Sequence, residues 1–211
     1  MIQVTRVESS CLSSNTYIVE ENGKAVIIDA GASYNEIKSE YSNIDNIKIM
    51  GILLTHSHFD HANCLDELME KFDCPCYVSE CGKEYLYSSQ GNLSYMGEKE
   101  FYLKNKNVIG LKDNEELDLL DTPIKVLYTK GHCKSCVTYF IQNTLFTGDF
   151  LFYRTIGRTD LPYSSNQDML ESLKRIKNLS GFEECFAGHG RSFDYETAMK
   201  TVDTYIKFMS R

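Results

Sequence analysis

The segment THSHFDH, residues 55–61, places three of the chain's five histidines and one aspartate directly after an apolar run. The run, residues 49–55, has the length and composition of a buried strand. His56 and His58 then lie at the carboxyl end of that strand, while Asp60 and His61 come where a helix is expected to begin. The helix is predicted by apolar residues at helical spacing, Leu65, Leu68, Met69 and Phe72. One short loop can therefore supply ligands for two metal ions.

Three further polar residues, His132, Asp149 and His189, each follow an apolar strand candidate and stand directly after a glycine. The three strand candidates are residues 124–128, 144–147 and 185–187. Ligands at the carboxyl ends of several strands are what a site at the edge of an open sheet requires. Neutral imidazole is the commonest nitrogen ligand for zinc and iron. The sequence thus predicts a set of seven metal ligands: His56, His58, Asp60, His61, His132, Asp149 and His189.

This set resembles the metal-binding motifs of the metallo-β-lactamase-fold hydrolase superfamily, and within it those of the glyoxalase II-like (hydroxyacylglutathione hydrolase-like) branch. THSHFDH matches the signature loop, GH at 131–132 the third-histidine motif, GD at 148–149 the bridging aspartate and GHG at 188–190 the last histidine. The matches run in order from Asp29, in AVIIDAG, to Gly190. The resemblance implies an α/β fold (α+β by some schemes), arranged as a four-layered αββα sandwich with the site at one edge of the sheets.

The resemblance also implies a role for each ligand. One divalent ion would be held by His56, His58 and His132, and the other by Asp60, His61 and His189. Asp149 would bridge the two ions together with a water or hydroxide, which makes Asp60 and Asp149 the expected catalytic carboxylates. Asp29 looks like the family's aspartate that orients the histidine loop; the alternative is an ordinary turn residue at the end of a strand.

Two divalent cations lower the pKa of a bridging water, so that a hydroxide can attack a carbonyl that one metal polarises. No serine or cysteine nucleophile is required. A thioester or related small ester is a suitable substrate, because a thiolate leaves readily once the oxyanion is stabilised. Zinc is the first expectation for both ions, with iron or manganese as alternatives, because all three accept mixed nitrogen and oxygen ligands.

Other activities of the superfamily stay open. IGRTDLP, residues 156–162, resembles a segment found both in small glyoxalase II-like hydrolases and in persulfide dioxygenases. The dioxygenases use a single iron on positions like His56, His132 and Asp149, and they are the alternative function. A binding protein without catalysis is disfavoured because every ligand is present. Flavodiiron proteins, which carry glutamate in place of His58, and zinc β-lactamases, which carry cysteine in place of Asp149, are disfavoured too.

Two substrate-binding residues are predicted. Arg158 is a candidate for binding a substrate carboxylate, because its planar guanidinium suits bidentate contact; the alternative is an ion pair with Asp160 that braces the loop. Residues 82–111 are a candidate lid over the site, in which Tyr95 is a candidate substrate contact, the alternative being ordinary packing or a dimer contact. Full-length glyoxalase II enzymes carry a helical carboxyl-terminal domain, whereas residues 190–211 have room for one helix, so the thiol stays open.

Composition fits one enzyme domain spanning residues 1–211, since a chain with 42% hydrophobic and 25% charged residues can bury a full core. The formal net charge of -8 and the lack of a basic stripe argue against nucleic acid. No apolar run is long enough to cross a membrane, and MIQVTRVESS does not read as a signal peptide. We therefore expect a cytoplasmic enzyme that acts on a small-molecule thioester or ester, with no nucleic-acid or membrane partner and an oligomeric state that is left open.

The eight cysteines are expected to be free thiols in a reducing compartment. A structural zinc on Cys64, Cys74, Cys76 and Cys81 is an alternative, but the C-x-C spacing departs from the usual zinc knuckles. Cys133 follows the predicted ligand His132, where nearby metals would lower its pKa and make it oxidisable. The alternative for Cys133 is a small buried strand residue.

Overall fold

The computed structural model describes residues 1–210, and its first sheet has six strands. These strands are β1 (Gln3–Glu8), β2 (Asn15–Glu21), β3 (Lys24–Ile28), β4 (Lys48–Leu53), β5 (Cys76–Ser79) and β6 (Val108–Leu111). They lie in the order β1-β2-β3-β4-β5-β6. The first three are antiparallel, whereas β3 to β6 run parallel to one another. Parallel strands put their carboxyl ends at one edge, which is where the histidine loop follows β4.

The second sheet also has six strands. They are β7 (Glu116–Leu117), β8 (Ile124–Tyr128), β9 (Val137–Ile141), β10 (Thr144–Gly148), β13 (Glu184–Ala187) and β14 (Phe193–Asp194). Their order is β14-β13-β10-β9-β8-β7, with β10 and β13 parallel and every other pair antiparallel. A separate hairpin is formed by β11 (Leu151–Phe152) and β12 (Thr155–Ile156).

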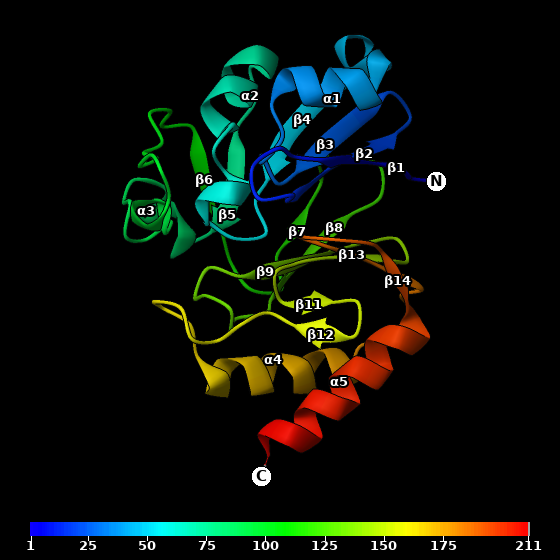
Figure 1. Ribbon diagram of the computed structural model, residues 1–211. Helices are drawn as coiled ribbons and strands as arrows, with labels where there is room; N and C mark the ends of the chain where they lie inside the picture. The colour runs from blue at the N-terminus through cyan, green and yellow to red at the C-terminus, as the bar shows by residue number, and fades with distance from the viewer. Residues whose placement is uncertain (211) are drawn as a thin grey trace.

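Helices cover the outer face of each sheet. The α-helices are α1 (Tyr34–Glu40), α2 (Leu65–Phe72), α3 (Gly82–Leu86), α4 (Asn166–Lys177) and α5 (Tyr195–Met209), and the 3-10 helices are η1 (Ser42–Asn46), η2 (Phe59–His61) and η3 (Ser94–Met96). Figure 1 shows α1 and α2 on one side of the molecule and α4 and α5 on the opposite side, with both sheets between them. The predicted four-layered αββα sandwich is confirmed. Among residues 1–210, no helix has both the length and the apolar character needed to cross a bilayer.

Three apolar clusters hold the four layers together, and β3 shows how they are separated. Ala25 and Ile27 belong to the cluster under α1 and α2, whereas Val26 and Ile28 belong to the cluster between the two sheets. Side chains alternate between the faces of a strand, so a strand buried on both faces must be apolar throughout. A third cluster packs α4 and α5 against the second sheet, through residues such as Leu173.

The elements around the site differ from the sequence prediction in two places. The apolar run at 49–55 forms β4, but the strand ends at Leu53, and Asp60 and His61 lie in the 3-10 turn η2 rather than at the start of α2. The turn is closed by the His61 amide, which donates to the His58 carbonyl at 3.0 Å. A 3-10 turn is tighter than an α-helical one. The loop thereby directs all its ligands inward before α2 begins at Leu65.

Candidate metal centre

The seven predicted ligands lie together at one edge of the sandwich, and we call them the ligand cluster. Four of them follow β4 of the first sheet, while the other three follow β8, β10 and β13 of the second sheet. Their ligand atoms form three overlapping groups, within each of which all atoms lie within 4.8 Å of one another. The groups are His56, His58 and His132; His56, His61 and Asp149; and Asp60, His61 and His189. Both sheets therefore contribute to one site.

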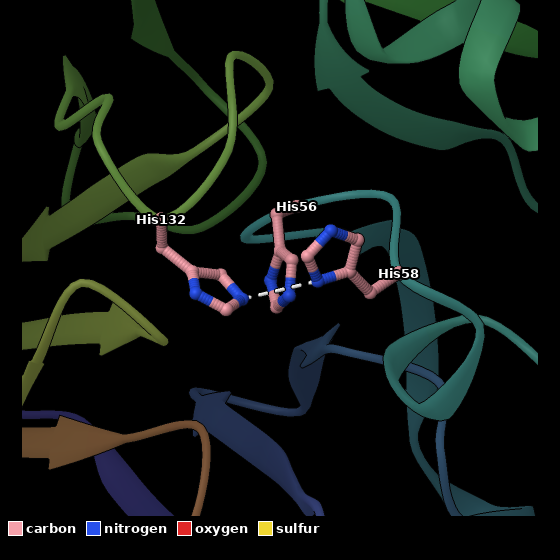
Figure 2. A group of neighbouring side chains, drawn as sticks. All are labelled: His56, His58 and His132. Carbon is pink, nitrogen blue, oxygen red and sulfur yellow. Dashed lines mark hydrogen bonds between the residues drawn. The ribbon is translucent and has the colours of Figure 1, made fainter. Parts of the chain in front are cut away.

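The first group consists of three buried imidazoles (Figure 2). His56 and His58 come from the loop after β4, His132 comes from the loop after β8, and the rings converge. His132 Nε2 lies 3.1 Å from His58 Nδ1. Burial lowers the pKa of His56 well below its ordinary value, and burial beside His132 lowers the pKa of His58 to about 3. Both imidazoles are therefore neutral, which is the form that binds a metal ion.

The group of Asp60, His61 and His189 combines a carboxylate with two imidazoles. His189 Nε2 lies 3.2 Å from Asp60 Oδ2 and 3.2 Å from His61 Nε2. His61 Nε2 lies 3.5 Å from the same carboxylate oxygen. The side chain of His189 is 29% exposed, whereas that of His61 is fully buried. This group therefore forms the side of the cluster that faces solvent.

Asp149 lies between the group that contains His132 and the group that contains His189. Its Oδ2 is 3.6 Å from His132 Nε2 and 3.6 Å from His189 Nε2, and its Oδ1 is 3.4 Å from His61 Nε2. Gly188 makes room for this carboxylate, because a Cβ at that position would collide with Asp149 Oδ1 and would lie 2.8 Å from His61 Cε1. The glycine that precedes His189 is thus required by the packing of the cluster.

Hydrogen bonds outside the cluster fix the orientation of four rings. Each Nδ1 donates to a neighbouring oxygen: His61 to Asp29 Oδ2 at 2.8 Å, His132 to the Arg158 carbonyl at 3.0 Å, His189 to the Ser13 carbonyl at 3.2 Å, and His56 to Thr55 Oγ1 at 3.1 Å. When such a ring is neutral, its proton is on Nδ1, and Nε2 is the nitrogen that faces the cluster and can bind a metal ion. Asp29 also accepts from the Thr55 amide at 2.7 Å and the Thr55 hydroxyl at 2.8 Å. It thus contacts the histidine loop at its first residue and at its last histidine.

The cluster buries negative charge that its own residues do not neutralise. Asp29 and Asp60 are buried, the side chain of Asp149 is only 12% exposed, and the partners of all three are mostly histidines. Burial opposes the protonated form of His61, yet the three surrounding carboxylates outweigh it and raise the pKa of His61 well above its ordinary value. Burial likewise raises the pKa of Asp149, but His61 and the other imidazoles lower it well below the usual range. Buried carboxylates of this kind need a cation close by.

Two buried atoms in the cluster lack a partner, and they test whether a metal ion fits. Within residues 1–210, His56 Nε2 and Asp149 Oδ1 make no hydrogen bond. Buried polar atoms are normally satisfied, so such atoms point to a missing ligand. An unprotonated imidazole nitrogen and a carboxylate oxygen are both good donors to zinc, iron or manganese. The residues present therefore fit a divalent cation.

The two predicted substrate-binding residues lie in different places. Arg158 lines a cleft that adjoins the cluster, and its guanidinium is paired with Asp160 through two hydrogen bonds of 2.7 Å. Tyr95 is 46% exposed and is not among the residues that line this cleft. Within the candidate lid, residues 82–111, Leu86 and Leu103 are buried in the cluster under α1 and α2. The Asn92 carbonyl of the same segment accepts from the Phe59 amide at 2.9 Å, so the segment also braces the histidine loop.

The cysteines do not contribute ligand atoms to the cluster. Within residues 1–210 all eight are free thiols, and the groups of side chains that could hold a metal ion contain none of them. Cys133 and Cys136 are buried with their Sγ atoms 3.0 Å apart. Cys133 lies in the loop between β8 and β9 rather than in a strand, and although burial raises the pKa of its thiol, hydrogen bonds with Cys136 and Ser135 lower it below its ordinary value.

Sequence reasoning missed several residues of the site. The cleft has a volume of about 580 Å³ and is lined by His132, Asp149, Phe152, Tyr153, Gly157, Arg158, His189, Gly190 and Arg191. Phe152 and Tyr153 belong to the short hairpin of β11 and β12, which no periodicity in the sequence indicates. Arg191 directly follows the GHG motif, and that adjacency is the signal that could have identified it.

The family model of the metallo-beta-lactamase superfamily matches residues 10–189, and the chain belongs to this superfamily. A "Probable metallo-hydrolase" of Streptococcus pyogenes, M6_Spy0554, is 31% identical and covers 91% of this chain and 85% of its own. The "Probable metallo-hydrolase YqgX" of Bacillus subtilis is 30% identical, covering 88% and 89%. The "Probable polyketide biosynthesis zinc-dependent hydrolase PksB" of the same species is 28% identical, covering 90% and 77%. Together with the ligand cluster, these relatives identify the chain as a metallo-hydrolase.

Solved structures agree on the fold. The BLEG-1 B3 metallo-beta-lactamase aligns with a TM-score of 0.86 at 25% identity, covering 94% of this chain and 97% of its own. TTHA1623 in a di-iron-bound form aligns with a TM-score of 0.81 at 26% identity, covering 93% and 97%. ETHE1 from Myxococcus xanthus aligns with a TM-score of 0.72 at 21% identity, covering 99% and 90%, and this likeness concerns the fold alone.

Proposed function

We propose that the protein hydrolyses thioesters or related small esters, as glyoxalase II-like enzymes do, with two divalent metal ions. The position of Asp149 carries this proposal, because its two oxygens lie 3.4 to 3.6 Å from nitrogens of His61, His132 and His189. A carboxylate between two sets of ligands is suited to holding two cations side by side. If the site held only one metal ion, one of the two sets of ligands would bind no metal.

When bound, divalent cations would supply Lewis acidity, which lowers the pKa of water and polarises a carbonyl group. One ion would be held by His56, His58 and His132, and the other by Asp60, His61 and His189. Asp149 would contribute to holding both ions. Asp29 keeps the Nδ1 proton of His61 away from the cluster, so that Nε2 stays available. The apolar side of Phe152 in the cleft excludes water from the acyl group of a substrate.

Zinc is the metal we propose first, with iron as the alternative. PksB is named as a zinc-dependent hydrolase, and TTHA1623 was solved in a di-iron-bound form. The ligand cluster has no thiolate, and its imidazoles and carboxylates suit either metal. The free thiols agree with the reducing cytoplasm in which we place the enzyme. None of residues 82–111 lines the cleft, and we propose this segment as a lid that contacts the histidine loop through the Asn92 carbonyl and the Phe59 amide.

The first experiment measures metal content by elemental mass spectrometry, together with hydrolysis of a thioester panel, on protein purified without added metal or chelator. We expect about two metal ions per chain and thioester turnover. Asp149→Ala should lose both, whereas Asp203→Asn, on the exposed face of α5, should keep both. Two metals and full turnover in Asp149→Ala would refute the bridging role.

The same preparation tests the alternative. A single iron per chain, with oxygen consumption on glutathione persulfide and no thioester turnover, would identify a persulfide dioxygenase. Nitrocefin belongs in the panel because of the likeness to a B3 metallo-beta-lactamase. Full metal loading without turnover of any substrate would favour a binding protein.

A further inference from the structure

The cleft beside the ligand cluster is apolar along one side and cationic at its rim. The apolar side is formed by Phe152, Tyr153 and Gly157. Besides the histidines of the cluster, the cleft is lined by two basic residues, Arg158 and Arg191. The two arginines differ in what already binds them. Arg158 donates two hydrogen bonds to the Asp160 carboxylate, so the pair carries no net charge.

Arg191 has no such partner. Within residues 1–210 its guanidinium makes no ion pair with a carboxylate, although Arg191 also lines a second hollow together with Glu183, Glu184 and Asp194. Its Cζ lies 3.6 Å from the centre of the Tyr153 ring. Stacking on an aromatic ring holds the planar guanidinium in one orientation and leaves its edge free for a bidentate acceptor. The chain carries a formal net charge of -8, so an unpaired cation beside the cluster provides a local positive charge on a protein that is negative as a whole.

We propose that Arg191, stacked on Tyr153, binds a carboxylate of the substrate and makes the enzyme prefer anionic thioesters to neutral ones. This inference rests on the proposed thioester hydrolysis and adds a specificity residue to it. The apolar side of the cleft receives the carbon chain between the thioester and the carboxylate. Arg158 stays bound to Asp160 and takes no part.

The test compares substrates that differ only in charge. S-Glutaryl-N-acetylcysteamine and its monomethyl ester place the carboxylate, or its neutral counterpart, on the acyl side. The acetyl thioester of 3-mercaptopropionate and its methyl ester place it on the thiol side. The wild-type enzyme should prefer the acid in at least one pair, and the pair that shows the preference identifies which side carries the carboxylate.

Arg191→Gln keeps polar hydrogens at the same position but removes the charge. We expect it to lower kcat/KM for the preferred acid about tenfold, mainly through KM, and to change the methyl ester less than about twofold. Arg154→Gln is the matched control, because Arg154 contacts the same Tyr153 ring at 4.9 Å but does not line the cleft. It should leave both substrates unchanged.

Three results would overturn the proposal: no preference for either acid in the wild type, equal losses for acid and ester in Arg191→Gln, or a loss for the acid in Arg158→Gln instead. A binding measurement separates this proposal from thioester hydrolysis itself. The thioethers S-(4-carboxybutyl)-N-acetylcysteamine and 3-(ethylthio)propionate are not hydrolysed, and their affinities can be measured by calorimetry on metal-loaded protein. At least one should bind the wild type about tenfold more tightly than Arg191→Gln, while its methyl ester does not, even if no thioester is turned over.

Discussion

Asp29 contacts the histidine loop at two points, and it does so from a backbone conformation that is uncommon for its residue type. Its φ is +61°, in the left-handed region that aspartate and asparagine tolerate better than most side chains. The strand β3 ends just before it, so the carboxylate turns toward Thr55 and His61. The conformation costs on the order of 1 kcal/mol, which the buried hydrogen bonds offset.

Asp29→Asn should therefore disturb the metal site while leaving the backbone intact. An asparagine amide can donate to His61 Nδ1, which moves the ring proton to Nε2 and blocks the nitrogen that faces the cluster. We expect metal affinity to fall about 10-fold to 100-fold, as for other residues that orient ligands. Competition with a chelator measures the affinity. Asp73→Asn is the control, since Asp73 also has a positive φ, of +46°, but lies at the end of α2; unchanged affinity in Asp29→Asn would refute the orienting role.

Gly188→Ala tests how tightly the cluster is packed. The added methyl group collides with the carboxylate of Asp149, so either Asp149 or the strand end at β13 must move. We expect a loss of about 1–3 kcal/mol in the free energy of unfolding, measured with urea in the presence of chelator, and loss of bound metal. Gly23→Ala, at a turn with φ +80° and open space around it, should lose only about 1 kcal/mol and keep its metal. Normal metal content in Gly188→Ala would contradict this view of the cluster.

At the scale of elements, α1 is a short helix whose start is specified by its own sequence. Ser33 caps the helix by accepting from the Glu36 amide, and the Glu36 carboxylate accepts from the Ser33 amide at 2.7 Å, which completes a capping box. The same carboxylate accepts from the Ser10 amide at 2.8 Å and thereby holds the loop after β1. Partial burial raises the pKa of Glu36, but these hydrogen bonds outweigh burial and lower the pKa to about 2.

This shift makes the stability of α1 depend on pH with a definite sign. Because the pKa in the folded protein is below its ordinary value of 4.5, the stabilisation is fully present above pH 4.5 and disappears as the pH falls toward 2. Glu36→Gln should lower the free energy of unfolding by about 0.5 kcal/mol at pH 7. Urea unfolding at several pH values measures the difference, which should vanish near pH 2. A constant difference across this range would contradict the assignment.

At the scale of the whole molecule, the ligand cluster joins the two sheets. His61 and Asp60 follow β4 of the first sheet, whereas Asp149 and His189 follow β10 and β13 of the second. A cation bound among them would link the two halves of the sandwich and compensate the buried carboxylates. Ligands that bind only the folded state stabilise it by mass action.

Removal of metal should therefore destabilise the whole fold. With free metal at about 1,000 times its Kd, the bound state gains about 4 kcal/mol, which corresponds to roughly 10 °C in Tm for a chain of this size. Thermal unfolding followed by circular dichroism, with metal and with chelator, measures this shift. Asp149→Ala should show a much smaller shift because it binds less metal. An identical Tm with and without metal in the wild type would argue against a site that joins the sheets.

The sequence by itself determined the identity of the seven clustered residues, and its resemblance to the metallo-β-lactamase-fold superfamily implied the four layers. β8 and α2 form where their apolar periodicity predicts them, because both faces of a central strand and one face of a helix must be apolar. His56, His132, Asp149 and His189 each follow a strand, and strand ends that share an edge meet in space. Local pattern therefore predicted individual elements and the cluster, while the arrangement in four layers followed from the family resemblance of the motifs.

Only the tertiary structure decided which groups surround those residues. The carbonyls of Ser13 and Arg158 orient His189 and His132 across 176 and 26 positions of the chain, and any residue type can supply a carbonyl. Arg158 and Arg191 look alike in sequence, yet one is paired with Asp160 and the other is stacked on Tyr153 at the edge of the cleft. Periodicity records which face of an element is buried, whereas these contacts depend on how separate loops approach one another, and that is set by the packing of the whole chain.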